Sequence, residues 1–464
     1  MRKAYLLFIL LLLGLPTTPL TAQDDTAAIP QVHTVQEGEN LTVIAEQYGI
    51  TVADLLLVNN LTDGDVLFVG QELIIPGGTG DATATVYAVQ AGDSWESIAA
   101  SFNTTAVSVL QSNRLINQQT QPYVGQTLSI ISRTGSPAPQ LILGQPIIAQ
   151  AGEGPLAVAV RANMAPAVLL ADNRLAYPAY LIPGQRLRAF GEQNYRDLPN
   201  EWIDVDIRPL PLVPGRTAVI HVKNLLDGQP TGQIGAMQLQ FSPTETGHSA
   251  IFGLDAFTTP EQVSLELSGS GSRPWPRFQQ DVQIRASDFV TQFITLPDTL
   301  NALLDPNVRQ NEEAILAPIF SQYTPERQWT ELFQTPIITN TAVTARYGDG
   351  RSYNNNPVTS YHSGVDYGAS QGVPVQAAAN GTVVFSDFLN VRGLTVIVDH
   401  GIGVMTSYSH LSESFATVGQ TVTAGTPLGA VGSTGLSSGP HLHWELRIMN
   451  MPVNALQWLE EPFP

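Results

Sequence analysis

The 464-residue chain contains no cysteine, and only 13% of its residues are charged. Disulfide scaffolds, thiolate zinc sites and a cysteine nucleophile are therefore excluded, and any metal must be held by histidine and carboxylate side chains. Basic residues are also scarce, with 21 against 40 acidic ones and a formal charge of −19. Because binding to nucleic acid requires a basic face, the composition predicts that nucleic acid is not a partner.

Long apolar runs are also absent, apart from one at the start of the chain. Residues 1–22 begin with Arg2 and Lys3, continue as a leucine-rich run to Leu15, and end in Ala22. This pattern is typical of a secretory signal peptide. The alternative is a membrane anchor, but the run is shorter than the roughly 20 residues that a spanning helix needs. We therefore predict cleavage of residues 1–22, a secreted or cell-envelope location, and no membrane span in the mature chain.

What the chain has in quantity is glycine, proline and apolar residues. Glycine (39) and proline (33) favour short strands, turns and linkers over long helices. A hydrophobic fraction of 43% is enough to bury several cores. At roughly 100–200 residues per domain, the length predicts a multidomain protein with three to five domains.

A repeat with a constant register occurs three times in the first part of the chain. The glycine of a Gly-acidic turn recurs at positions 38, 92 and 152, and an asparagine recurs at 59, 113 and 173, so both advance by 54 and then 60 residues. In the first copy, residues 41, 44, 45 and 48 are apolar or aromatic and have the spacing of one helix face. Each copy predicts a small β-α-α-β unit, and the three units span residues 32–76, 86–131 and 148–190.

This repeat resembles the LysM carbohydrate-binding module through its Gly-Asp/Glu turn, its Asn-x-Leu and its closing Gly-Gln. The third copy carries Gly154 and Pro155 where its first helix should begin, and is predicted to be degenerate. The resemblance implies binding to the N-acetylglucosamine chains of peptidoglycan or chitin, by hydrogen bonds from loop backbone and amide groups to N-acetyl groups. The alternative is a spacer or a protein-docking module. Segments 77–85 and 132–140 have the small, polar composition of linkers.

Residues 200–330 predict a middle domain with little sign of chemistry. Short apolar or alternating runs, such as 217–222 and 263–267, are separated by Gly, Pro, Ser and Asp. Several short strands at regular spacing favour a small β-sandwich-like domain, and a helical segment is predicted from Asp298 to Trp329. We predict a spacer or orienting role for this region.

The strongest compositional anomaly is a cluster of histidines near the end of the chain. Five of the eight histidines fall within 82 residues, at positions 362, 400, 410, 441 and 443. In residues 441–447 apolar and polar residues alternate, which predicts a strand with both of its imidazoles on one face. His362 and Asp366 lie four apart around Gly364, which lets the backbone bend so that the two side chains converge. Two imidazoles and one carboxylate suit a tetrahedral zinc ion with an open fourth position.

Three other residues near these patterns have less certain roles. A strand-like stretch places Tyr408 and His410 on one face, where Tyr408 either donates to an oxyanion or packs in the core. Glu445 shares a face with His443 and either orients it or forms a salt bridge. His400 ends a strand before a Gly turn and is predicted to be structural or to support the site.

The segment 336–456 resembles the lysostaphin-type zinc metalloendopeptidases that cut peptidoglycan. The resemblance rests on the motifs His-Ser-Gly-Val-Asp, Tyr-Ser-His-Leu and Gly-Pro-His-Leu-His-Trp-Glu. It implies a compact antiparallel β fold with the metal in an open groove and Zn2+ as the cofactor. By the same resemblance, the metal ligands are His362, Asp366 and His443. The pair that acts on the substrate or on water is His410 and His441.

The full set of five site residues predicts an active enzyme. Zinc lowers the pKa of a bound water and polarises a peptide carbonyl, and a neutral imidazole of His410 or His441 can take the water proton and return it to the departing amine. We therefore predict a secreted zinc-dependent endopeptidase that hydrolyses peptide bonds of peptidoglycan and is anchored to the wall by its LysM modules. The alternative is a non-catalytic wall-binding regulator or an activator of another cell-wall hydrolase. A metalloprotease that cuts secreted proteins is a third possibility.

Overall fold

The computed structural model of the protein divides into two compact units, Met1–Thr83 with Arg133–Gly135, and Ala84–Ser132 with Ser136–Pro464. Among the helices that the structure describes, none is long and apolar enough to cross a membrane. The predicted signal peptide lies outside the described residues. The structure describes residues 31–48, 50, 52, 55, 56, 59, 61, 67–75, 83–113, 115, 121–132, 145–173, 175, 176, 178–189, 196–199, 201–337 and 341–464.

The first compact unit contains the first repeat, which we call module 1 (residues 32–76). Its helix α1 (Leu41–Tyr48) buries Leu41, Ile44 and Ala45, on the face that the sequence spacing predicts. These residues form one apolar cluster with Leu73. Two antiparallel strands complete the described part of the module, β1 (Gln31–Thr34) and β2 (Glu72–Ile75).

The second and third repeats, called module 2 (residues 86–131) and module 3 (residues 148–190), each have the order β-α-α-β with their two strands paired. Pro155 does not disturb module 3, because it takes the first helical position, where the N–H that it lacks would have no partner within the helix. Module 2 contains β3 (Thr83–Ala88), α3 (Trp95–Ser101), α4 (Ala106–Ser112) and β4 (Thr127–Ser132). Module 3 contains β5 (Gln145–Ile148), α5 (Pro155–Arg161), α6 (Pro166–Asp172) and β6 (Arg186–Ala189).

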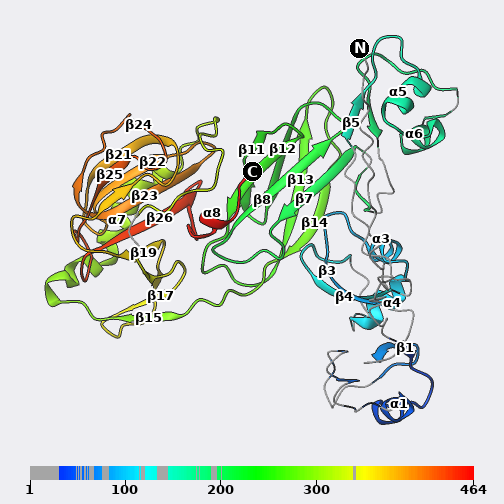
Figure 1. Ribbon diagram of the computed structural model, residues 1–464, viewed down its shortest axis with the longest axis horizontal. Helices are drawn as coiled ribbons and strands as arrows, with labels where there is room; N and C mark the ends of the chain where they lie inside the picture. The colour runs from blue at the N-terminus through cyan, green and yellow to red at the C-terminus, as the bar shows by residue number, and fades with distance from the viewer. Residues whose placement is uncertain are drawn as a thin grey trace, which may run out of the picture. The chain divides into compact units, whose positions relative to one another are not determined.

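The middle domain consists of two four-stranded antiparallel sheets (Figure 1, green). Its strands are β7 (Trp202–Arg208), β8 (Thr217–Asn224), β9 (Gln229–Ile234), β10 (Met237–Leu239), β11 (Phe241–Pro243), β12 (His248–Gly253), β13 (Gln262–Ser270) and β14 (Phe278–Gln283). One sheet has the order β10-β9-β13-β14 and the other β11-β12-β8-β7. Both contribute to a single core that includes Ile220 and Leu265, which is the arrangement of a sandwich.

The helical segment that follows is shorter than the sequence predicts. A 3-10 helix, η1 (Asp298–Leu304), leads into α7 (Pro306–Phe320), and the residues from 321 to Trp329 are not helical. Pro325 prevents a helix from continuing to Trp329, because the residue before a proline, here Thr324, is disfavoured in the helical conformation.

This segment packs on the C-terminal domain, and the boundary between the domains therefore lies earlier than residue 330. Leu316 and Phe320 of α7 form an apolar cluster with Ile397 and Met405. Strand β15 (Thr291–Ile294) pairs in parallel with β17 (Gly350–Tyr353) of the C-terminal domain. The sequence could not show these contacts, because both join segments that are far apart in the chain.

The C-terminal domain is built on one large antiparallel sheet, and its predicted β character is confirmed. Besides β17, its elements are β16 (Val343–Ala345), β18 (Ser360–Tyr361), β19 (Val365–Gly368), β20 (Pro374–Gln376), β21 (Gly381–Leu389), β22 (Gly393–Asp399), β23 (Val404–Ser414), β24 (Thr421–Val422), β25 (Pro427–Val431), β26 (His441–Ile448), β27 (Met451–Val453) and the short helix α8 (Gln457–Glu460). The central strand order is β16-β19-β26-β23-β22-β21-β24.

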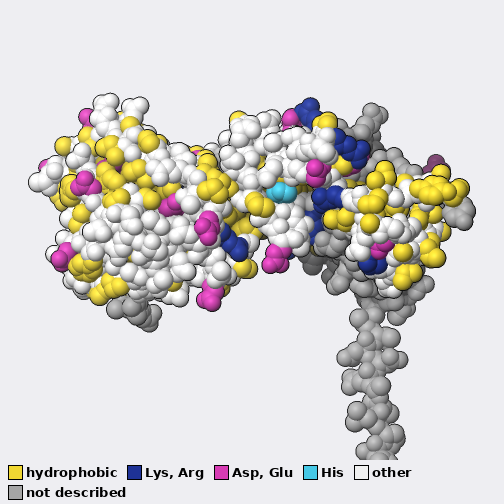
Figure 2. Space-filling view, turned by 90° about the horizontal axis from the view of Figure 1, so that it is seen from above, with side chains coloured by type: hydrophobic (Ala, Val, Ile, Leu, Met, Phe, Trp, Pro, Cys, Tyr) yellow, Lys and Arg dark blue, Asp and Glu magenta, His cyan; other side chains and the backbone are white. Residues whose placement is uncertain are grey.

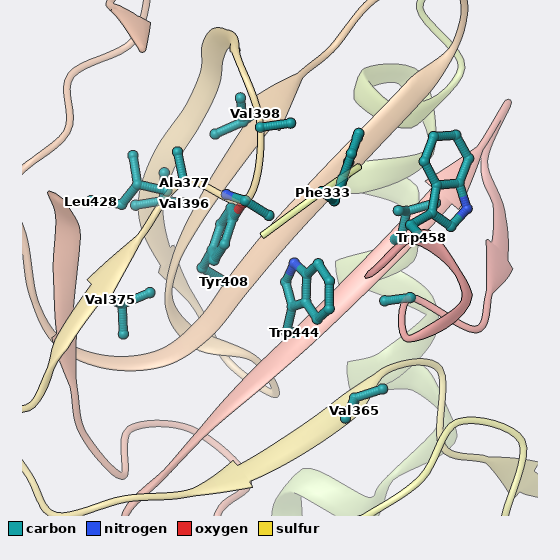
Figure 3. Packing of buried hydrophobic residues seen from close by; sticks show 14 of the residues in the cluster. Phe333, Val365, Val375, Ala377, Val396, Val398, Tyr408, Leu428, Trp444 and Trp458 are labelled. Carbon is teal, nitrogen blue, oxygen red and sulfur yellow. The ribbon is translucent and has the colours of Figure 1, made fainter. Parts of the chain in front are cut away.

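Strand β26 separates the core of this domain from its polar face. Leu442, Trp444 and Leu446 belong to the core, and Figure 3 shows Trp444 among the buried side chains. Because side chains alternate along a strand, His441 and His443 point to the opposite face. The alternation that the sequence displays in residues 441–447 thus places both imidazoles outside the apolar core.

The face drawn in Figure 2 reflects the low charge content of the chain. Where it is described, acidic side chains stand mostly singly among apolar and uncharged polar ones. The net negative charge is therefore spread over this face and does not gather in one acidic patch there.

Candidate metal centre and active site

The structure brings the three predicted metal ligands together in one buried cluster. Asp366 Oδ1 lies 2.9 Å from His362 Nε2 and 2.9 Å from His443 Nδ1, and these two ring nitrogens are themselves 2.9 Å apart. All three residues are buried. The ligand atoms of a tetrahedral zinc ion lie about 3.3 Å apart at bond lengths of about 2.0–2.1 Å. The two imidazoles and one carboxylate could therefore hold such an ion after small movements.

Strand pairing and one glycine explain why these side chains meet. Asp366 of β19 lies directly opposite His443 of β26 in the antiparallel ladder. A Cβ atom at Gly364 would lie 2.5 Å from the carbonyl oxygen of Trp444 and 2.8 Å from Cε1 of His443. Gly364 is not among the residues with a left-handed backbone. The glycine is therefore required for close approach of two segments, and not for the backbone bend that we predicted.

The contacts around the cluster turn one ligand atom of each of the three residues toward the other two. His362 Nδ1 lies 2.9 Å from the carbonyl oxygen of Arg346, so we assign its proton to Nδ1 and a lone pair to Nε2. His443 Nε2 faces Glu445 at 3.5 Å. Burial would lower the pKa of His443, but Asp366 and Glu445 raise it. Burial would raise the pKa of Asp366, but His362 and His443 hold it well below its usual value. Three potential ligand atoms thus converge on one point, where one carboxylate and two imidazoles could bind a cation.

Behind His443, a buried network of charges fixes Glu445. The Glu445 side chain is fully buried, and its oxygens lie 2.5 Å from Arg447 Nε and 3.3 Å from an Arg392 nitrogen. Burial would raise the pKa of Glu445, but Arg447 and Arg392 keep it well below its usual value. Arg392 also pairs with Glu312 and Glu313 of α7, at 3.0 and 2.8 Å. The carboxylate that faces His443 is therefore ionised and held in place.

His410 and His441 lie beside the cluster, with ring centroids 4.7 Å apart. His410 Nδ1 lies 2.7 Å from the carbonyl oxygen of Thr434, and His441 Nδ1 lies 2.8 Å from that of Gly439. We therefore assign Nδ1 of each ring as the donor to its backbone carbonyl. His441 Nε2 lies 3.8 Å from Asp366 Oδ1. Burial and the neighbouring histidines lower the pKa of His410 to about 3, so this ring is neutral.

Strand β23 contains an irregularity that separates Tyr408 from His410, and the predicted common face is wrong. The register with β22 shifts between Leu394 and Val396, and His410 has a φ of 61°. Such a bulge re-aims one side chain, and here it directs His410 toward the histidine cluster. Tyr408 instead lies in the core, where its hydroxyl accepts a hydrogen bond from the backbone of Ala378. Figure 3 shows this buried position, which favours the packing role and not the oxyanion role.

His400 lies apart from the cluster and is fully buried. Its Nδ1 lies 2.7 Å from the carbonyl oxygen of Asn380, and its Nε2 lies 2.8 Å from Thr406 Oγ1. Burial lowers the pKa of His400 to about 4. These contacts are those of a neutral structural histidine.

The histidine cluster lines a cavity of about 840 Å3, and the structure adds a residue to it that the sequence did not indicate. Arg351 of β17 is mostly buried, and one of its nitrogens lies 3.3 Å from Asp366 Oδ2, the oxygen turned away from the histidines. Arg309 of α7 also lines this cavity. The contact joins Arg351 of β17 to Asp366 of β19, which belong to different sheets, so no local sequence pattern could have revealed it.

Two family models match separate parts of the chain. Residues 360–455 match the model of peptidase family M23, and residues 33–76 and 87–130 match the model of the LysM domain. The chain therefore carries an M23 peptidase domain and two LysM domains, and the resemblances seen in the sequence are confirmed at these segments.

Several curated proteins are similar to the chain over about 95 residues. The DD-carboxypeptidase/endopeptidase Mpg of Neisseria meningitidis is 46% identical over 20% of this chain and 22% of its own length. The murein hydrolase activator EnvC of Escherichia coli is 41% identical over 21% and 23%. The peptidoglycan DD-endopeptidase ShyA of Vibrio cholerae is 40% identical over 21% and 22%. The chain thus spans less than a quarter of the length of these relatives.

Proposed function

We propose that the protein is a secreted, zinc-dependent endopeptidase that hydrolyses peptide bonds of peptidoglycan and is held on the wall by its LysM modules. The observation that carries this proposal is the convergence of five side chains in one cavity. Three of them present ligand atoms to one point, and two more are imidazoles beside it, each with its Nδ1 at a backbone carbonyl. The M23 family match and the two similar endopeptidases support a peptidase.

We assign the metal to His362, Asp366 and His443. When bound there, zinc would lower the pKa of a water molecule and polarise the carbonyl of the scissile peptide. Glu445 orients His443 by facing its Nε2, and Arg351 holds the second oxygen of Asp366. These contacts keep Nδ1 of His443 and one oxygen of Asp366 turned toward the ion.

We assign the proton transfers to His410 and His441. Each ring has its Nδ1 proton occupied by a backbone carbonyl, so Nε2 is the atom that can accept a proton from the attacking water. The same atom, once protonated, can deliver the proton to the amine of the leaving fragment. A protonated imidazole can also stabilise the developing oxyanion.

We assign wall attachment to the LysM modules. Binding to an insoluble glycan raises the local concentration of the peptide substrate around the tethered peptidase domain, without any new contact at the active site. The two activities then act on one polymer. An exported location follows from this substrate.

Digestion of purified peptidoglycan tests the enzymatic proposal. We expect wild-type protein with zinc to release new amino groups, and expect His443→Ala and His410→Ala to release none. His248→Ala, which changes a histidine of the middle domain, serves as the control and should remain active. A chelator should abolish release, and added zinc should restore it. Equal release by wild type and both active-site variants would contradict the proposal.

The similarity to EnvC supports a second candidate, an activator of another cell-wall hydrolase. Such a protein would use the cavity to hold a partner and would release no amino groups by itself. The digestion experiment separates the two functions, because an activator increases release only when a second hydrolase is added, whereas an endopeptidase acts alone.

A further inference from the structure

Gln280 of β14 connects the two loops of module 2 by its side-chain amide. Its Oε1 accepts a hydrogen bond of 2.7 Å from the backbone N–H of Gly92, in the Gly-acidic turn. Its Nε2 donates to the carbonyl oxygens of Asp93 at 3.1 Å and Pro122 at 3.0 Å. Gln280 is only 7% exposed. One planar amide of the middle domain therefore satisfies a donor and two acceptors that module 2 presents.

The acetamido group of N-acetylglucosamine is also a planar amide, with one carbonyl acceptor and one N–H donor. It could therefore replace the bond to Gly92 and one of the two bonds that Gln280 Nε2 donates. We propose that Gln280 occupies the place of this group in module 2, so that module 2 docks on the middle domain instead of binding glycan. This proposal rests on one part of the proposed function, namely that LysM modules of this chain bind N-acetylated sugars.

The contacts around Gln280 make this docking extensive. The backbone of Val124 donates to Asp281 at 2.9 Å and accepts from Gln283 at 2.9 Å, which forms a short parallel bridge to β14. Ala91 and Val124 of module 2 belong to the core of the middle domain. A glycan at this face would have to break these backbone bonds and expose buried apolar surface, and both changes are unfavourable.

The space around equivalent glycines distinguishes the modules. A Cβ atom at Gly92 would lie 2.6 Å from Leu198 Cδ2, and one at Gly125, in the closing Gly-Gln turn, would lie 3.2 Å from Pro211 Cα. At Gly38 and Gly152, the counterparts of Gly92, such an atom would meet nothing within 4 Å among the described residues. Module 2 therefore serves as a structural part of the middle domain, and of the two modules that match the LysM model glycan binding is left to module 1.

Hydrogen exchange of the full-length protein tests this proposal, measured by mass spectrometry with and without the pentamer of N-acetylglucosamine. Without the sugar, we expect the amide of Gly92 to exchange at least about 100-fold more slowly than that of Gly38, because Gly92 opens only when the docked face opens. With the sugar, peptides that contain Gly38 should gain protection and those that contain Gly92 should not change.

Two variants of neighbouring residues on β14 separate the amide from general effects of charge. Gln280→Glu cannot donate to Asp93 or Pro122, so exchange at Gly92 should rise at least about 10-fold. Gln279→Glu makes the same change on an exposed residue of the same strand and should leave Gly92 unchanged. If Gln280→Glu does not fold, Gln280→Met provides a side chain of similar size without hydrogen-bonding groups, and the same rise is expected.

Two results would overturn the proposal, fast exchange at Gly92 in the free protein and protection of Gly92 by the sugar. A third result would contradict the proposed function itself. If the sugar protects no module, glycan binding fails and Gln280 cannot be an acetamido substitute. Slow exchange at Gly92 that depends on Gln280 would then still establish the docking of module 2.

Discussion

Glu445 Oε2 faces His443 Nε2 at 3.5 Å, on the far side of the imidazole from Asp366. The ring therefore lies between two carboxylates. Asp366 is a proposed ligand of the same metal, and Glu445 is not. Arg392 and Arg447 keep Glu445 ionised. Arg392 is in turn held by the buried Glu312 of α7, an element outside the segment that matches the peptidase family.

We predict that Glu445→Gln lowers zinc affinity by about 10- to 100-fold, because the outer partner of a ligating histidine sets its orientation and basicity. Competition with a chelator of known affinity would measure the change, after circular dichroism has shown that the variant is folded. Glu313→Gln is the matched control, since Glu313 pairs with the same arginines but is 44% exposed and does not contact His443. Unchanged affinity in Glu445→Gln would contradict this role.

The features that the sequence predicted correctly are those that repeat or converge within a few residues. The alternation in β26 placed His441 and His443 on one face, and the four-residue spacing brought His362 near Asp366. Both depend on local geometry that a strand or a turn fixes within a few residues. The helix face of module 1 was predicted for the same reason, because its spacing is that of a single helix.

Features that depend on contacts between distant segments could not be predicted. The bulge that re-aims His410 becomes visible only in the register of β23 with β22. The pairing of Arg351 with Asp366 joins β17 and β19, which belong to different sheets. The docking of Gln280 on module 2 joins residues 188 positions apart. The sequence carried no local signal for any of these, since each partner is an ordinary residue in its own segment.

The left-handed backbone of His410 leads to a prediction that separates catalysis from folding. Asparagine tolerates a positive φ, whereas a β-branched residue at such a φ costs about 1–2 kcal/mol. We therefore expect His410→Asn and His410→Val both to lose peptidoglycan cleavage. In urea unfolding, His410→Val should be less stable than His410→Asn by about 1–2 kcal/mol. Equal stability of the two variants would show that the bulge is not maintained.

The buried His400 predicts a specific dependence of stability on pH. Its pKa is about 4 in the folded state, against 6.5 as the ordinary value. As the pH falls from 6.5 to 4, the unfolded chain binds a proton that the folded protein does not, so the contribution to stability is complete above pH 6.5 and is lost on acidification. A shift of this size corresponds to about 3 kcal/mol.

His400→Gln keeps a side chain that can hydrogen bond but does not titrate. We expect the unfolding free energy of wild type to fall more steeply between pH 7 and 4 than that of His400→Gln, by about 3 kcal/mol in total. Urea unfolding of both proteins, saturated with zinc, would measure the difference. Parallel pH profiles would show that His400 has the same pKa in the folded and unfolded states, and would contradict this prediction.

Thr217 of the middle domain is enclosed by the C-terminal helix α8. Gln457 Oε1 accepts from the Thr217 N–H at 2.8 Å, Gln457 Nε2 donates to the Thr217 carbonyl at 3.1 Å, and Trp458 Nε1 donates to its hydroxyl at 2.8 Å. All three residues are buried. These bonds couple the middle domain to the peptidase domain, so the two should unfold together.

We predict that Gln457→Ala weakens this coupling, because it leaves the N–H and carbonyl of Thr217 without partners at a cost of about 1–3 kcal/mol for each group. Glu460→Ala, an exposed position of the same short helix, is the control and should behave like wild type. Differential scanning calorimetry should show the shared transition of the two domains separate into two, or move to lower temperature, in Gln457→Ala alone. A single unshifted transition would mean that the domains are held together by their apolar contacts and not by this side chain.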